Sequence, residues 1–178
     1  MGSADEDFAE FAAARYASLV RSARLLGFGP DEAQDLVQST LLRCYRAWHR
    51  IERAHHPDAY VYRVLVNQGR RTFRRRWRGE VPTTSAQLTE AGDQDAGTGG
   101  DHDVSLTVRA ALRTLSPGHR AVLVLRFDAG LSERDTAAAL GIPLGTVKSR
   151  TSRALEELSR QPGLAGLTTA GSRENHAD

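Results

Sequence analysis

The sequence predicts an all-α protein of two small helical domains, joined by a flexible acidic linker, with a helix-turn-helix in the second domain. Apolar residues recur at spacings of three and four in every periodic segment, and no segment alternates polar and apolar residues as a half-buried strand would. Residues 79–104 have almost no apolar side chains to bury. The 178-residue chain has a single cysteine, Cys44, which lies in an apolar pattern and is expected in the core.

The first predicted domain comprises residues 8–78 and follows an N-terminal tail, residues 1–7. Its first helix covers residues 8–26, its second begins near Pro30, and its third follows Pro57. Proline suits the first turn of a helix because the N–H that it lacks would have no partner there. Three helices with this much apolar surface can form one small core.

The second predicted domain comprises residues 105–160, and residues 161–178 are expected to form a disordered tail. Ser116 is expected to cap one helix, and Ser132 is expected to cap a short helix that ends at Gly141. Another helix follows within a few residues. Two helices separated by so short a turn indicate a helix-turn-helix.

Charge is distributed unevenly along the chain, although the formal net charge is only +2. Residues 43–78 contain eleven arginines and two acidic residues, whereas residues 79–104 contain six acidic residues and no basic one. Residues 105–160 contain nine basic and five acidic residues. Two basic segments on either side of an acidic spacer indicate two contacts with nucleic acid.

The last predicted helix, from about Val147 to Leu158, has a small and basic outward face near its N-terminal end. In a helix-turn-helix these positions enter the major groove, where lysine and arginine reach phosphates or guanine edges and short hydroxyls reach either. The alternative is a solvated helical face. The candidate DNA-binding residues are Thr146, Lys148, Ser149, Ser152 and Arg153.

The helix after Pro57 has a face with basic residues and no acid, opposite its apolar stripe. A solvated face usually mixes charges of both signs, so this pattern favours contact with a nucleic-acid backbone. The face is formed by Arg63, Asn67, Arg70, Arg71, Arg74 and Arg78.

The helix after Pro30 has an exposed stripe of a different kind, formed by Asp35, Gln38, Leu42 and Arg46. An exposed leucine alone usually has no function. Here, however, the leucine lies among a carboxylate, an amide and a guanidinium at helical spacing, and such a stripe fits a protein-docking face equally well.

Other classes of function have little support. The residues His49, His55, His56 and Cys44 do not have the spacing of a metal site, and no paired carboxylates or activated nucleophile are evident. We therefore expect no enzymatic activity, cofactor, metal or small-molecule substrate. The chain has no apolar run long enough to cross a membrane and begins with acidic residues, so we expect a cytoplasmic protein without membrane insertion.

Three segments resemble the extracytoplasmic-function (ECF) sigma factors of bacterial RNA polymerase, in the order expected for that family. They are DEAQDLVQSTLLRCYRAW, HHPDAYVYRVLVNQGRRTFRRR and LSPGHRAVLVLRFDAGLSERDTAAALGIPLGTVKSRTSRALEEL. The resemblance covers about residues 8–160 and is greatest to actinobacterial members of the sigma-E type. It implies that the chain binds core RNA polymerase and promoter DNA and directs promoter-specific initiation.

The resemblance also implies a role for each surface. The family's first domain docks on core polymerase through positions matched by Asp35, Leu36, Gln38 and Leu42. The helix that follows recognises the minus-10 promoter element, and its positions match Arg63, Asn67, Arg70, Arg71 and Arg74. The final domain reads the minus-35 element through Lys148, Ser149, Ser152 and Arg153.

Two questions stay open from the sequence. A stand-alone helix-turn-helix regulator is the alternative function; it would account for residues 105–160 but not for the arginine-rich helix or the Asp35 face. The sequence also leaves open whether an anti-sigma factor holds the protein inactive.

Overall fold

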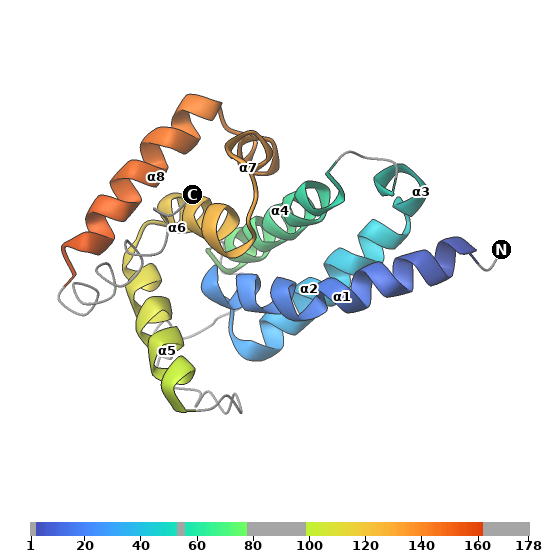
Figure 1. The fold of residues 1–178 in the computed structure, drawn as a ribbon, viewed down its shortest axis with the longest axis horizontal. Helices are drawn as coiled ribbons and strands as arrows, with labels where there is room; N and C mark the ends of the chain where they lie inside the picture. The colour runs from blue at the N-terminus through green and yellow to red at the C-terminus, as the bar shows by residue number, and fades with distance from the viewer. Residues whose placement is uncertain (1–2, 53–55, 78–98, 162–178) are drawn as a thin grey trace, which may run out of the picture.

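The computed structural model describes residues 3–52, 56–77 and 99–161, and every regular element in these ranges is helical (Figure 1). The N-terminal part contains α1 (Ser3–Leu25), α2 (Pro30–Tyr45), α3 (Trp48–Ile51) and α4 (Pro57–Trp77). The C-terminal part contains α5 (Gly99–Thr114), α6 (Pro117–Leu123), the π-helical segment η1 (Val124–Asp128), α7 (Glu133–Leu140) and α8 (Leu144–Ser159). The predicted all-α class is confirmed.

Two helices begin earlier than the apolar pattern indicates. Helix α1 begins at Ser3, where Asp5 and Glu6 in the first turn favour a helix N-terminus although they add nothing to the apolar stripe. Helix α5 begins at Gly99, within the segment expected to be linker. Residues 79–98 of that segment lie outside the described residues, as do Arg78 and residues 162–178.

The predicted helix ends in the C-terminal part are present. Ser116 accepts a hydrogen bond from the backbone N–H of His119 at 3.3 Å, and Ser132 accepts one from that of Asp135 at 3.0 Å. Helix α7 ends at Gly141, whose φ of 65° is left-handed and favours glycine. These local signals set the short turn between α7 and α8.

The N-terminal helices pack around Leu19, Val37 and Leu65, and Cys44 is buried beside them as expected. The C-terminal helices contribute Leu125 and other buried residues to this same cluster, including Val122, Leu140 and Val147. Helix α4 lies directly against α7, as Figure 1 shows near the middle of the molecule. One core cluster therefore spans the two predicted domains, and a second buried cluster lies within the C-terminal part, around Leu112, Leu115 and Leu123.

Candidate nucleic-acid and polymerase-binding surfaces

Helix α8 begins after Pro143 and buries Val147 and Ala154 against the other helices. This orientation leaves four of the five candidate minus-35 residues exposed, namely Lys148, Ser149, Ser152 and Arg153, whereas Thr146 is half-buried. Leu155, which the periodicity assigns to the apolar stripe, is 45% exposed instead. The basic face near the N-terminal end of α8 is thus exposed, as it must be for the helix to enter a DNA groove.

Two basic residues of α8 already have neighbours in the protein. The ammonium of Lys148 lies 3.7 Å from a carboxylate oxygen of Glu133, at the start of α7. The guanidinium of Arg150 packs over Gly118, where an added Cβ would lie 3.2 Å from its Nη1 atom. Arg150 therefore holds α8 to α6, while Lys148 can exchange an exposed carboxylate for a phosphate.

The arginine-rich face of α4 is exposed at Arg63, Asn67, Arg70 and Arg71. The side chains of Arg74 and Arg78 lie outside the described part of the structure. The opposite side of α4 buries Val61, Tyr62, Leu65 and Val66, as the periodicity predicts for the last three. Arg70 also donates a hydrogen bond to the backbone carbonyl of Leu140 at 3.1 Å, so the helix-turn-helix already engages one candidate minus-10 residue.

On α2 the candidate docking residues Asp35, Gln38 and Leu42 are exposed, and Leu42 is 54% exposed. Leu36 is only 6% exposed and packs in the core, so its side chain is not part of this face. The reason is geometric, because Leu36 follows Asp35 by one residue and projects about 100° away around the helix.

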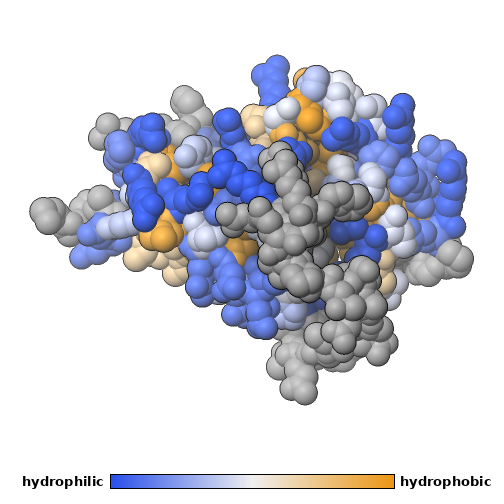
Figure 2. Space-filling view, turned by 180° about the vertical axis from the view of Figure 1, so that it is seen from behind, coloured by the Kyte–Doolittle hydropathy of each residue, from blue (hydrophilic) through white to orange (hydrophobic). Residues whose placement is uncertain are grey.

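Tyr45 extends this exposed face, although the apolar periodicity assigns it to the core. It is 45% exposed and donates a hydrogen bond from its hydroxyl to Asp5 of α1 at 2.9 Å, which raises the pKa of the tyrosine. Its ring packs on Phe8, with ring centroids 5.2 Å apart. Figure 2 shows the molecule from behind the view of Figure 1, and hydrophobic areas there lie among hydrophilic ones where the surface is not covered by grey atoms.

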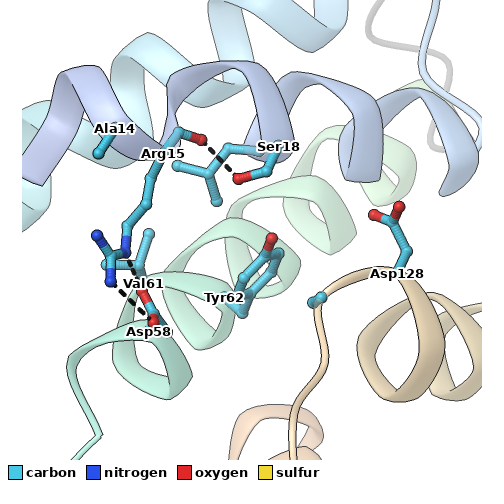
Figure 3. A pocket seen from close by; sticks show the side chains of 9 residues that line it. Ala14, Arg15, Ser18, Asp58, Val61, Tyr62 and Asp128 are labelled. Carbon is cyan, nitrogen blue, oxygen red and sulfur yellow. Dashed lines mark hydrogen bonds and ion pairs between the residues drawn. The ribbon is translucent and has the colours of Figure 1, made fainter.

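A pocket of 270 Å³ lies between α1, α4 and the end of η1 (Figure 3). Arg15 binds Asp58 across its rim, and this hydrogen bond raises the pKa of the guanidinium. The hydroxyl of Tyr62 lies 3.3 Å from that of Ser22, and burial raises the pKa of the tyrosine. The ionisable groups that line the pocket thus have partners within the protein.

Asp128 also lines this pocket, and no sequence pattern singled it out. It lies in η1 but accepts hydrogen bonds from two α1 residues, Arg21 and Ser22. The partners are more than 100 residues apart in sequence, so no local spacing could reveal them. Asp128 is therefore a contact between the two parts of the chain.

The described residues contain no cluster of three or more metal-ligating side chains. His49 and His56 are exposed, Cys44 is buried, and His55 lies outside the described residues. Within the same ranges, no helix is both long and apolar enough to cross a membrane.

Comparison with known proteins identifies two matching families. Residues 12–79 match Sigma-70 region 2, and residues 105–158 match Sigma-70, region 4. The chain is 41% identical to an RNA polymerase sigma-E factor of Streptomyces coelicolor over 155 residues, which are 87% of this chain and 85% of that protein. It is 33% identical to the ECF RNA polymerase sigma factor EcfG of Rhodopseudomonas palustris, over 72% of this chain and 70% of that one.

Among solved structures, the sigma factor RpoE of Bartonella quintana in complex with the anti-sigma factor NepR superimposes with a TM-score of 0.66. The two are 28% identical, and the match covers 84% of this chain and 94% of that one. The match thus covers most of both chains.

Proposed function

Since the chain belongs to the ECF RNA polymerase sigma factors, which bind core polymerase and direct promoter-specific initiation, we propose a residue-level division of this work among α2, α4 and α8. Residues 8–78 form the region 2 domain, residues 105–160 the region 4 domain, and residues 79–104 connect them. The observation that carries the proposal is the exposure of two basic faces, on α4 and α8, and of a mixed face around Leu42 on α2.

The exposed face of α2, with Asp35, Gln38 and Leu42, docks on core polymerase. An exposed apolar side chain ringed by polar groups is typical of a protein contact. Leu36 supports this face from below, since it packs in the core.

Helix α4 contacts the minus-10 element through Arg63, Asn67, Arg70, Arg71 and Arg74. Helix α8 reads the minus-35 element through Lys148, Ser149, Ser152 and Arg153, with Thr146 at its start. Arginine and lysine supply phosphate contacts and guanine readout, and the short serines leave room for close approach to base edges.

The protein catalyses no reaction itself, acts in the cytoplasm beside the polymerase, and is held inactive by an anti-sigma factor. The family of transcription factors to which it belongs supports the first statement. The complex of the Bartonella relative with NepR supports the last. A stand-alone helix-turn-helix regulator would leave the match of residues 12–79 to Sigma-70 region 2 without a role.

Reconstitution with bacterial core polymerase tests the α2 assignment. Leu42→Glu places a charge in the docking face and is expected to lower affinity for the core at least tenfold. Leu155→Glu makes the same change at a similarly exposed leucine of α8 and is expected to bind the core like the wild type. Equal core affinity of both variants and the wild type would refute the docking face.

Arg153→Ala tests the α8 assignment. It is expected to weaken binding of the holoenzyme to a minus-35-containing promoter by about 5- to 100-fold while core binding is kept. The control is Arg160→Ala, because Arg160 lies about 10 Å further along the helix and pairs with Glu156. Loss of core binding by Arg153→Ala would show that this face contacts polymerase and not DNA.

A further inference from the structure

An ion pair joins the two helices of the helix-turn-helix at the face proposed to meet DNA. The ammonium of Lys148 lies 3.7 Å from a carboxylate oxygen of Glu133, and the two side chains are 61% and 40% exposed. Glu133 is the first residue of α7, and Lys148 lies in the second turn of α8, which packs beside α7 (Figure 1). Because Lys148 is a candidate minus-35 residue, the carboxylate that it binds lies at the edge of the same face.

The geometry of a helix-turn-helix brings this carboxylate close to the DNA backbone. When the second helix of the motif lies in the major groove, the first helix crosses the backbone. Glu133 is at the start of that first helix and beside a residue of the second. A carboxylate there repels phosphates and so weakens attraction to DNA of any sequence.

The other acidic residues of the helix-turn-helix are paired elsewhere. Their partners are not candidate DNA-binding residues, so their charges are balanced away from the proposed DNA face. The pairs are Asp135 with Ser132, Glu156 with Arg160 and Glu157 with His119. Glu133 is different, because its partner is a residue proposed to contact DNA.

The chemistry of Lys148, the only lysine of the chain, allows it to keep this partner while it reads a base. An ammonium has three N–H donors on a flexible stem. One donor can bind Glu133 while the others bind a guanine edge, which presents the acceptors O6 and N7 in the major groove. A phosphate contact is less favourable, because it brings a second negative group to the same ammonium.

We propose that Glu133 is a specificity-determining residue, which restrains Lys148 from binding phosphates and directs it to a base edge of the minus-35 element. The inference rests on the proposed function of α8. Sequence-independent binding depends on phosphate contacts, so Glu133 weakens it. In the specific complex Lys148 keeps its carboxylate partner, so Glu133 costs little there. The residue thus raises the ratio of specific to sequence-independent affinity, which decides how well a promoter competes with other sites.

Glu133→Gln tests the proposal in holoenzyme assembled with bacterial core polymerase. The probes are a promoter fragment that the wild-type holoenzyme selects from random sequence and the same fragment with its minus-35 element scrambled. The variant is expected to bind the scrambled fragment about 2- to 5-fold more tightly, which is the size of an exposed ion pair. Its affinity for the intact fragment is expected to change less than about twofold, so that the specificity ratio falls.

The salt dependence shows whether Lys148 is the residue that Glu133 restrains. For the scrambled fragment, the slope of log affinity against log salt between about 0.05 and 0.2 M is expected to steepen by about one in Glu133→Gln, because Lys148 then neutralises a phosphate. In a Lys148→Gln background, Glu133→Gln is expected to lose this gain.

Glu156→Gln is the matched control. It makes the same change of charge at another exposed glutamate, whose partner is Arg160. Glu156 lies about 12 Å along α8 from Lys148, farther than the screening length of about 8 Å at physiological salt. Both fragments are expected to bind this variant like the wild type, which separates a local effect from one of net charge.

Equal changes of affinity for the two fragments, no change for either, or the same gain in the Lys148→Gln background would each overturn the proposal. A loss of affinity for the intact fragment alone would also overturn it, since Glu133 would then read a base itself. If scrambling the minus-35 element left wild-type affinity unchanged, the proposed function of α8 would fail. If scrambling lowered wild-type affinity but Glu133→Gln kept the wild-type ratio, the inference about Glu133 alone would fail.

Discussion

Gly69→Ala tests the closest approach between α4 and the rest of the N-terminal core. An added Cβ would lie 2.9 Å from Cζ of Phe28, 3.1 Å from its Cε2 and 3.6 Å from Cδ2 of Leu36. The first distance is shorter than Cβ contacts in real proteins, and Phe28 is only 3% exposed, so its ring has little room to move.

Two opposing effects decide the result for Gly69→Ala. Alanine is favoured over glycine in a helix interior by about 1 kcal/mol, whereas overpacking a filled core costs about 1–3 kcal/mol. Because the closest contact is to a buried ring, we expect an overpacking cost in the upper part of that range, about 2–3 kcal/mol. The net loss in the free energy of unfolding is then about 1–2 kcal/mol, and the fall in Tm about 2–8 °C for a chain of this size. Urea denaturation followed by far-UV circular dichroism measures both the stability and its denaturant dependence.

Gly145→Ala is the matched control, because nothing lies within 4 Å of the added methyl group on α8. The same substitution is expected there to leave stability unchanged or to raise it by up to about 1 kcal/mol. If Gly69→Ala were as stable as the wild type, the packing of Phe28 on α4 would be looser than the structure describes and the reasoning would be refuted.

Three further predictions concern single side chains. Burial raises the pKa of the Cys44 thiol from 9.0 to about 11, so this thiol loses its proton at lower pH in the unfolded chain than in the folded one. The free energy of unfolding is therefore expected to fall by up to about 2–3 kcal/mol as pH rises from about 9 to 11. Urea unfolding of Cys44→Ala across this pH range should lack that fall, and parallel profiles of the variant and the wild type would contradict the prediction. Ser132→Ala removes the cap of α7 and is expected to cost about 1 kcal/mol in the free energy of unfolding, whereas Ser159→Ala at the end of α8 should cost little. Arg120→Lys leaves most of the four carbonyls bound by this guanidinium without a donor and is expected to lower Tm in a thermal melt; an unchanged Tm would show that water replaces those bonds.

Local signals predicted the helices and their ends well. The caps at Ser116 and Ser132 and the left-handed Gly141 depend on contacts within a few residues, and such contacts are encoded in neighbouring positions. The exposed basic residues of α8 follow from the same helical periodicity that buries Val147 and Ala154. The family resemblance placed these elements in the correct order along the chain.

Periodicity alone failed at positions where an apolar side chain serves the surface. Tyr45 and Leu155 fall on apolar stripes yet are both 45% exposed, because a stripe wider than the neighbouring helix leaves its edge uncovered. Leu36 is a different case: its place on the apolar stripe predicts burial, which the structure confirms, whereas the family resemblance groups it with the docking face.

Sequence patterns did not predict the contacts between distant parts of the chain. Nothing in the spacing of Asp128, Arg21 or Ser22 indicates that they meet, and the apolar residues of α4 and α7 could equally have served two separate cores. A pattern shows that a face is buried but not which helix buries it. The contact of Asp128 with α1 is therefore visible only in the three-dimensional structure.

The shared core also bears on how promoter specificity can be engineered. Exchanging helices α5–α8 for those of a relative looks like a modular way to change the minus-35 preference. In such a chimera the acceptors at positions 140 and 26 would survive, because any residue supplies a backbone carbonyl. The pairing of Asp128 with Arg21 would survive only if the incoming segment also has a carboxylate at position 128, because Arg21 lies in α1, which is not exchanged. A graft that carries the recognition helix without that carboxylate would change where the holoenzyme binds and, at the same time, remove a contact between the two parts of the chain.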